Sequence, residues 1–229
     1  MNTVDDYNFK DKTALVRVDF NVPLNEDLEV TDTTRIQAAK PTILKILEDG
    51  GSLVLMSHLG RPKGKESKYS LHHIEDAVSE IIGVEAKFME DCVGEDVKAA
   101  ADNLQSGEIL LLENLRFHEE EKEGNEKFAK QLSELGDIYV NDAFGAAHRA
   151  HASTTIVAKY FEDKCLGYLL AKEIKNLDKV LNSEEKPVTA ILGGAKVSSK
   201  ITVIENILDK IDHLIIGGGM AFTFIKAQG

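Results

Sequence analysis

The sequence predicts an α/β protein whose first domain is a three-layer structure built on a parallel sheet. Strand-like runs alternate with helix-like runs along most of the chain, which is typical of parallel strands joined by helices. Several strand-like runs, such as SLVLMSH (52–58) and GEILLLEN (107–114), have a continuous apolar centre rather than an alternating pattern, as expected when helices cover both faces of a sheet. Together these patterns indicate a Rossmann-like first domain.

This domain is expected to open with a β-rich run at 13–20 and a helix over 33–51 that ends in two glycines. Because proline removes an interior N–H, Pro41 predicts a short helical turn followed by a new helix start. The acidic segment 118–127 is expected to be an exposed helix start. The other expected elements are strand 52–58, helix 71–82, strand 84–90, helix 94–104, strand 107–114, helix 125–135 and strand 137–144.

A longer amphipathic helix at 168–182 interrupts the alternation, and a charged segment with Pro187 follows it. We therefore place a first domain at 1–167, an interdomain helix and linker at 168–186, and the start of a second α/β domain at 187–229. Two strand–helix repeats cannot complete a doubly wound sheet, so the second domain is expected to be incomplete. Its expected elements are strand 187–194, helix 198–211, strand 213–219 and helix 220–226.

Composition narrows the class of partner. The 229 residues carry a formal net charge of −12, which argues against a general nucleic-acid or membrane-surface binder. Cys92 and Cys165 belong to no CxxC pair, so we expect reduced thiols in a cytoplasmic protein and no zinc framework. The polar N-terminus predicts no signal peptide, and no apolar run approaches membrane-spanning length.

Only five of the 27 Lys and Arg residues are arginines, and their places form a pattern. Arg61, Arg116 and Arg149 each follow a predicted strand, Arg35 lies where the first long loop enters a helix, and Arg17 lies inside the first strand. The carboxyl ends of parallel strands share one edge of a sheet, so four of these arginines map to one rim. Because a guanidinium fits phosphate and carboxylate bidentately, the rim predicts a pocket for a small ligand with several negative charges. The alternative is that the arginines are scattered among loops.

Other polar residues map to the same rim. His58 follows the second strand across a glycine turn, and His148 and His151 flank Arg149. Asp19 and Asn21 come directly after the first strand and suit a ligand hydroxyl or carboxylate, although each type is more often a turn or cap residue.

A second set of glycines follows the strands of the second domain. Lys196 and Lys200 are spaced i, i+4, which predicts both ammonium groups on one helical face near its positive end, a nucleotide-phosphate site. Gly194, Gly217 and Gly218 would shape the same side. The segments match neither a Walker A loop nor GxGxxG, and close strand–helix packing also explains such glycines.

No arrangement in the sequence resembles a Ser/His/Asp triad or a metal-ligand set. Asp142 beside His148 allows acid–base chemistry, but a helix or turn cap is the favoured interpretation. The histidines expected to be structural or surface residues are His72, His73, His118 and His213.

Seven segments taken together resemble the phosphoglycerate kinase family, in order and spacing, from end to end of the chain: RVDFNVP, TRI, SHLGRP, LENLRFHEEE, NDAFGAAHRAHAS, GGAKVSSK and GGGMAFTF. The resemblance implies two α/β domains joined by a long helix, with 3-phosphoglycerate on the first and the magnesium nucleotide on the second. Members are nearly twice as long, so the resemblance implies that the metal-coordinating acidic segment is absent from this chain.

The resemblance also implies residue roles. Asp19 and Asn21 would bind the carboxylate and hydroxyl region of the glycerate, and Arg35 would face the reacting carboxyl group. The distal phosphate would be clamped by His58, Arg61, Arg116 and Arg149, in a field strengthened by Arg17, His148 and His151. Lys196 and Lys200 would contact nucleotide phosphates, with Gly194, Gly217 and Gly218 lining that side and Lys196 following the moving phosphoryl group.

The implied reaction passes a phosphoryl group between 1,3-bisphosphoglycerate and ADP, giving 3-phosphoglycerate and ATP, with Mg²⁺ bound to the nucleotide and hinge bending near 168–186. A monomer is expected. The main alternative is that this chain alone is a non-catalytic phosphoglycerate-binding module. A nicotinamide dehydrogenase is disfavoured because GxGxxG and a suitably placed acidic residue are absent.

Overall fold

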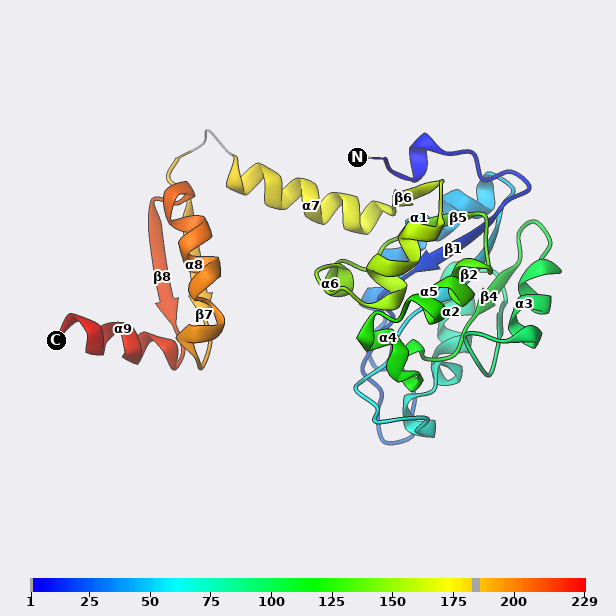
Figure 1. The fold of residues 1–229 in the computed structure, drawn as a ribbon, viewed down its shortest axis with the longest axis horizontal. Coiled ribbons are helices and arrows are strands. Elements are labelled where there is room, and N and C mark those ends of the chain that lie inside the picture. The colour runs from blue at the N-terminus through cyan, green and yellow to red at the C-terminus, as the bar shows by residue number, and fades with distance from the viewer. Residues whose placement is uncertain (1, 183–185) are drawn as a thin grey trace. The chain divides into compact units, whose positions relative to one another are not determined.

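The structure, a computed structural model, describes residues 2–182 and 186–229 (Figure 1). The chain divides into two compact units, Met1–Lys172 and Glu173–Gly229, and each is described by itself. In the described part of the chain, no helix has the length and apolar character needed to cross a membrane.

The first unit is built on a six-stranded sheet in the order β3-β4-β2-β1-β5-β6, and every paired strand is parallel to its neighbour. The strands are β1 (Thr13–Arg17), β2 (Ser52–Met56), β3 (Ala86–Phe88), β4 (Ile109–Leu111), β5 (Ile138–Asn141) and β6 (Lys164–Leu166). Short β6 pairs with β5 at the sheet edge and was not predicted, because its three residues carry no apolar run.

Helices cover both faces of this sheet. In β2, Leu53 and Leu55 pack with α1 (Thr34–Glu48) and α2 (Glu75–Ile82), whereas Val54 packs in the cluster that contains α3 (Glu95–Asp102) and α5 (Glu126–Ser133). Successive side chains of a strand point to opposite faces, so a strand buried on both sides is apolar at most of its positions. The predicted three-layer parallel α/β class is confirmed.

Shorter elements complete the first unit. They are the α-helices α4 (Glu119–Glu123) and α6 (Phe144–Ala147), the start of α7 (Tyr168–Leu181), the π-helical turn η5 (Ala152–Ile156), and the 3-10 turns η1 (Val4–Asp6), η2 (Ser67–Tyr69), η3 (Leu71–Ile74), η4 (Leu115–Phe117) and η6 (Val157–Tyr160). The predicted helix 71–82 therefore begins as a 3-10 turn, and the predicted helix 168–182 corresponds to α7.

Two details of the prediction are wrong. α1 runs without a break through Pro41, because that residue faces solvent while Ala39, Thr42 and Ile43 around it are buried and hold the helix on the sheet. The segment 118–127 is not exposed throughout, since Glu121 is buried. A run of acidic letters gives no sign that one of them points inward.

The second unit contains two parallel strands, β7 (Thr189–Gly193) and β8 (His213–Gly217). Besides the greater part of α7, its helices are α8 (Ile201–Ile207), between the 3-10 turns η7 (Val197–Ser199) and η8 (Leu208–Lys210), and α9 (Met220–Gln228). Its buried hydrophobic residues in the described part are Ile204 and Met220, whereas large side chains such as Ile191 and Phe222 are exposed. This unit thus has far less buried core than the first.

Asp142 joins the end of β5 to the start of α7. The carboxylate is fully buried and its Oδ1 accepts a hydrogen bond from Leu170 N at 3.1 Å, as the cap interpretation expected. A Cβ on Gly167 would lie 2.2 Å from Asp142 Cγ, so this close approach requires glycine. Oδ2 is buried without a hydrogen-bond partner, and burial raises the pKa of Asp142 to about 6 against smaller opposing effects from Thr42 and the α7 backbone.

We predict that Asp142→Asn reduces the loss of stability that occurs as the pH rises from about 4 to about 6. The folded pKa of about 6 exceeds the unfolded value of 3.8, so the stabilising contribution of the protonated carboxyl is lost as pH rises through 6. The free energy of unfolding of the wild type, relative to the variant, should fall by roughly 1–3 kcal/mol across this interval.

Urea denaturation at several pH values measures this difference. Asp102→Asn, the same change at an exposed position of α3, is the control and should follow the wild type. Parallel pH profiles for wild type and Asp142→Asn would show that the buried carboxyl does not titrate in this range.

Candidate functional site

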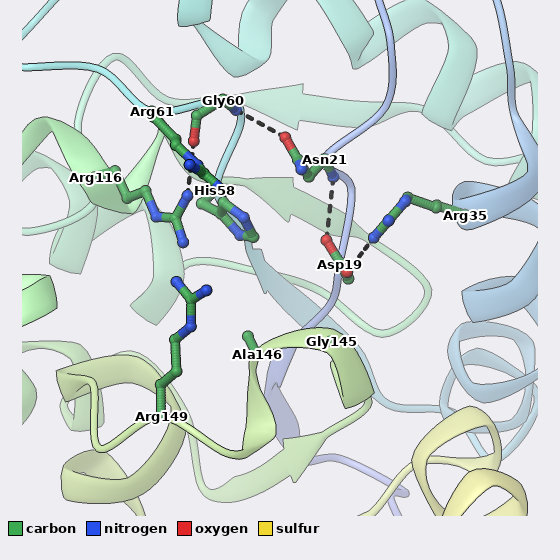
Figure 2. A pocket seen from close by; sticks show the side chains of 10 residues that line it. All are labelled: Asp19, Asn21, Arg35, His58, Gly60, Arg61, Arg116, Gly145, Ala146 and Arg149. Atoms are coloured by element: carbon green, nitrogen blue, oxygen red, sulfur yellow. Dashed lines mark hydrogen bonds and ion pairs between the residues drawn. The ribbon is translucent and has the colours of Figure 1, made fainter. Parts of the chain in front are cut away.

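A cavity of about 240 Å³ lies beyond the carboxyl ends of strands β1, β2, β4 and β5 of the first unit (Figure 2). The connections that leave the neighbouring strands β1 and β5 run in opposite directions along the sheet. β1 is followed by α1 and then β2 on one side, and β5 is followed by β6 on the other. Ligands of open α/β sheets bind at such a switch point. The cavity is lined by Asp19, Asn21, Arg35, His58, Gly60, Arg61, Arg116, Gly145, Ala146 and Arg149.

Four of the five arginines face this cavity. Figure 2 shows Arg61, Arg116 and Arg149 on one side and Arg35 on the other. Arg116 is largely buried, and its Nη1 donates to Gly60 O at 2.7 Å. Burial lowers the pKa of Arg116, and the neighbouring positive charge of Arg149 lowers it further. A bound anion would relieve this repulsion, so the cavity favours a ligand with concentrated negative charge.

The polar residues after β1 form the opposite wall. Asn21 Oδ1 accepts from Gly60 N at 2.8 Å, which fixes the amide group, and Asn21 N donates to Asp19 Oδ1 at 3.4 Å. Asp19 also forms an ion pair with Arg35, whose side chain is half exposed. Asp19 therefore offers the cavity a hydrogen-bond acceptor while Arg35 balances its charge.

Small residues that the sequence reasoning did not assign to the site make room for these side chains. A Cβ on Gly145 would lie 2.8 Å from Asp19 Oδ2. Gly60 adopts a φ of +63°, and its added Cβ would lie 2.4 Å from the Tyr69 ring. The small-residue runs GAAH and LGRP were the available signals, since glycine permits both close approach and positive φ.

His58 and Arg17 meet at the back of the cavity. Arg17 is fully buried and does not line the cavity; its Nη2 lies 3.2 Å from His58 Nδ1. Burial, followed by the charges of Arg17 and the other arginines, lowers the pKa of His58 to about 2. His58 is therefore neutral at physiological pH and can serve as a hydrogen-bond donor but not as a positive charge.

The other two histidines of the predicted site lie beside the cavity. His148 is exposed, and its Nε2 accepts from Arg149 Nε at 3.3 Å. His151 is buried, with Nδ1 3.6 Å from Glu121 Oε1, and lines an adjoining hollow together with Arg61 and Arg149. Both histidines therefore lie next to the arginines that form the cavity wall.

The second unit brings its glycines together at the ends of β7 and β8. Gly193 pairs with Gly217, and Gly218, with a φ of +70°, lies so close to Gly194 that an added Cβ would meet Gly194 O at 3.0 Å. The prediction that Lys196 and Lys200 share a helical face is wrong. Lys196 is extended and precedes η7, whereas Lys200 follows η7 directly before α8, so a 3-10 turn separates them.

Among the residues that the structure describes, the candidate metal-ligand group does not fit magnesium. In the described part of the chain, one group of three potential metal ligands comes together, with donor atoms within 4.8 Å: Asp91, Cys92 and His118. Magnesium prefers oxygen ligands, whereas a thiol and an imidazole suit softer metals. Burial raises the pKa of the Cys92 thiol well above its ordinary value, and His118 Nε2 contacts Asp91 Oδ1 at 2.8 Å. These three residues therefore do not form a magnesium site.

Comparison with known proteins gives one family. A family model described as "Phosphoglycerate kinase" matches residues 4–229. Curated relatives with that name include the proteins of Moorella thermoacetica, 56% identical over 228 residues, and Porphyromonas gingivalis, 48% identical over 252 residues. Each match covers 99% of this chain but only 58% and 60% of those relatives, so the chain spans about three fifths of their length.

Solved structures agree. The phosphoglycerate kinase of Coxiella burnetii has a TM-score of 0.86 and 39% identity, covering 99% of this chain and 57% of that one. The phosphoglycerate kinase of Pyrococcus horikoshii has a TM-score of 0.87 and 35% identity, covering 100% of this chain and 58% of that one.

The buried, neutral state of His58 predicts a pH dependence opposite in sign to that of Asp142. The folded pKa of about 2 lies below the unfolded value of 6.5, so stability is lost as pH falls below 6.5. His58→Asn, whose Oδ1 can still accept from Arg17, should lose less stability than the wild type between about pH 7 and about pH 5, by roughly 1–2 kcal/mol.

Urea denaturation over this pH range measures the difference, with His213→Asn at an exposed position as the control. If His58→Asn and the wild type lose stability equally on acidification, His58 is protonated in the folded protein and the assignment of a neutral donor is wrong.

Proposed function

Because the chain belongs to the phosphoglycerate kinase family, we propose that its cationic cavity binds the glycerate phosphate that the kinase phosphorylates or dephosphorylates. The observation that carries this proposal is the convergence of four arginines on one cavity that also presents Asp19 and Asn21. A three-carbon acid with a phosphate at one end matches a cavity that is strongly cationic on one side and mixed in charge on the other.

The proposed ligand has a definite orientation. Its phosphate lies among Arg61, Arg116 and Arg149, which supply planar arrays of N–H donors. Its hydroxyl and carboxyl groups lie against Asp19 and Asn21: the carboxylate of Asp19 accepts from the hydroxyl, and the amide of Asn21 donates. His58 adds a neutral donor on the phosphate side.

In the whole protein we propose reversible glycolytic phosphoryl transfer in the cytoplasm. A phosphate oxygen of ADP attacks the phosphorus of 1,3-bisphosphoglycerate, and the bond from phosphorus to the carboxyl oxygen breaks, leaving 3-phosphoglycerate and ATP. Nucleophile and leaving group are both ionised at neutral pH, so no general base is needed. The catalytic work is positioning and charge neutralisation.

Arg35 is proposed to neutralise charge on the reacting carboxyl group, since it is the arginine that lies on the Asp19 side of the cavity. Lys196 and Lys200 of the second unit are proposed to contact nucleotide phosphates beside Gly194, Gly217 and Gly218. Binding of magnesium together with the nucleotide stays a prediction. Hinge bending near 168–186 and a monomeric state stay predictions.

For this chain alone, we propose binding without turnover. The cavity is formed entirely by residues of the first unit, so phosphoglycerate binding needs nothing outside it. Calorimetric titration with 3-phosphoglycerate and with ADP, together with a turnover assay, separates a binding module from an active enzyme. The proposal expects heat from 3-phosphoglycerate and no turnover.

We predict that Arg149→Ala weakens 3-phosphoglycerate binding by about 10- to 100-fold, the size expected when a charge-assisted hydrogen bond is removed. Arg149 is exposed, so its loss should leave folding intact. Lys159→Ala removes an exposed positive charge that pairs with Glu126 outside the cavity, and should leave the affinity unchanged. Equal affinities for both variants would place the phosphate elsewhere, and an absence of binding by the wild type would reject the cavity's proposed ligand.

In the full-length protein, Arg35→Ala should lower kcat by on the order of 10³-fold, as for other arginines that stabilise phosphoryl transfer. Lys87→Ala, a surface residue paired with Glu108, is the control. Steady-state kinetics measures both, and an unchanged kcat for Arg35→Ala would remove Arg35 from the catalytic step.

A further inference from the structure

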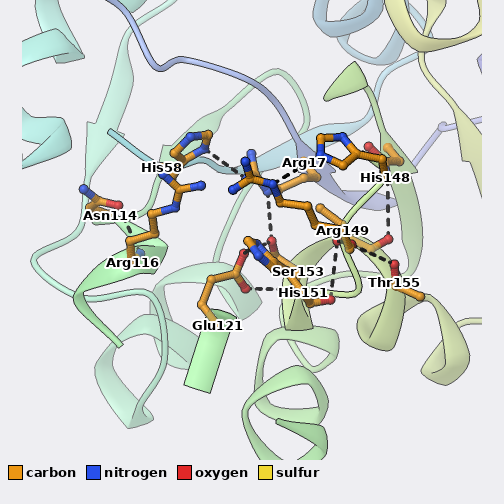
Figure 3. Close-up of polar contacts among 12 residues, drawn as sticks. Arg17, His58, Asn114, Arg116, Glu121, His148, Arg149, His151, Ser153 and Thr155 are labelled. Atoms are coloured by element: carbon orange, nitrogen blue, oxygen red, sulfur yellow. Dashed lines mark hydrogen bonds and ion pairs between the residues drawn. The ribbon is translucent and has the colours of Figure 1, made fainter. Parts of the chain in front are cut away.

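Glu121 is a buried carboxylate that lies outside the cavity but is connected to it (Figure 3). It belongs to α4, where its neighbours Glu119 and Glu120 are exposed, yet its own exposure is 1%. Its Oε1 accepts from Ser153 Oγ at 2.6 Å, and its Oε2 accepts from Ser153 N at 2.9 Å. Both carboxylate oxygens thus accept a hydrogen bond from the same serine, and Oε1 also lies 3.6 Å from His151 Nδ1.

A chain of contacts runs from this serine through Arg17 to His58, which lines the cavity. Because the hydroxyl proton of Ser153 points to Glu121, Ser153 Oγ is free to accept from Arg17 Nε at 2.9 Å. Arg17 Nη1 donates to Val18 O, and Nη2 lies 3.2 Å from His58 Nδ1. A guanidinium has donors only, so His58 Nδ1 must accept.

The charge balance supports the same chain of contacts. Arg17 is fully buried, and a buried charge needs a counter-charge. Burial would raise the pKa of Glu121, but the contact with His151, the charge of Arg17 and the two bonds from Ser153 outweigh it and hold the pKa below its ordinary value. Glu121 is therefore ionised and acts as the negative partner of Arg17.

We infer that Glu121 is a positioning residue which, through Ser153 and Arg17, holds the ring proton of His58 on Nε2. In this tautomer Nδ1 is occupied by Arg17, and Nε2–H is the polar group that His58 can present to the cavity it lines. An N–H donor suits a phosphate oxygen, whereas the other tautomer would direct a lone pair at it. The role in ligand binding rests on the proposed function, but the tautomer itself does not.

Nitrogen-15 NMR of the imidazole rings in the ligand-free chain tests the tautomer. The wild type should show an unprotonated Nδ1 and a protonated Nε2 for His58. In Glu121→Gln and in Ser153→Ala, the Nδ1 and Nε2 resonances of His58 should move toward the average of the two tautomers. The reason is that the contacts through Ser153 no longer hold the guanidinium of Arg17 in place. Glu113→Gln is the matched control: Glu113 is similarly buried, and its carboxylate accepts from Ser70 and from two backbone N–H groups.

A proton on Nδ1 in the wild type, or an unchanged wild-type pattern in the two variants, overturns the inference. Ser153→Ala keeps the test decisive if Glu121→Gln does not fold, and the wild-type spectrum is decisive without either variant. Calorimetry with 3-phosphoglycerate should show about tenfold weaker binding for both variants, corresponding to one hydrogen bond to the ligand. If the wild type does not bind 3-phosphoglycerate but the tautomer responds as expected, the proposed function fails and the inference stands.

Discussion

Mutual repulsion among four arginine side chains around one cavity is the constraint on which the first unit depends. In a chain of net charge −12 these guanidinium groups nevertheless line one cavity, and three of them are held by different contacts. Arg35 pairs with Asp19, Arg116 donates to Gly60 O, and Arg149 contacts His148. Buried Arg17 behind them is balanced by Glu121, so its positive charge is not left without a counter-charge in the core.

The sheet makes this convergence possible. Parallel strands end at one edge, so residues far apart in the sequence meet there without any local attraction between them. Burial of apolar side chains on both faces supplies the stability that the polar edge does not. The close approaches at Gly60 and Gly145 show how little spare room the edge leaves, since a single added carbon would meet Tyr69 or Asp19.

Some of this could be predicted from the sequence and some could not. Arg61, Arg116 and Arg149 lie in the segments that follow strands, and this order was enough to place them at the edge of the sheet where the cavity lies, because strand direction fixes where the next segment begins. The role of Glu121 could not be predicted from the sequence, because only the folded helix α4 distinguishes it from the exposed glutamates beside it. Lys196 and Lys200 were placed on one helical face because their spacing was interpreted as α-helical, whereas a 3-10 turn lies between them. Local spacing predicts a face only once the type of helix is known.

A crystal structure of this chain with 3-phosphoglycerate tests the central claim most directly, because it locates the phosphate. The account predicts electron density for the phosphate among Arg61, Arg116 and Arg149, with the carboxyl end of the ligand toward Asp19 and Arg35. A ligand bound with its phosphate away from these three guanidinium groups, or an empty cavity at saturating ligand, would contradict it.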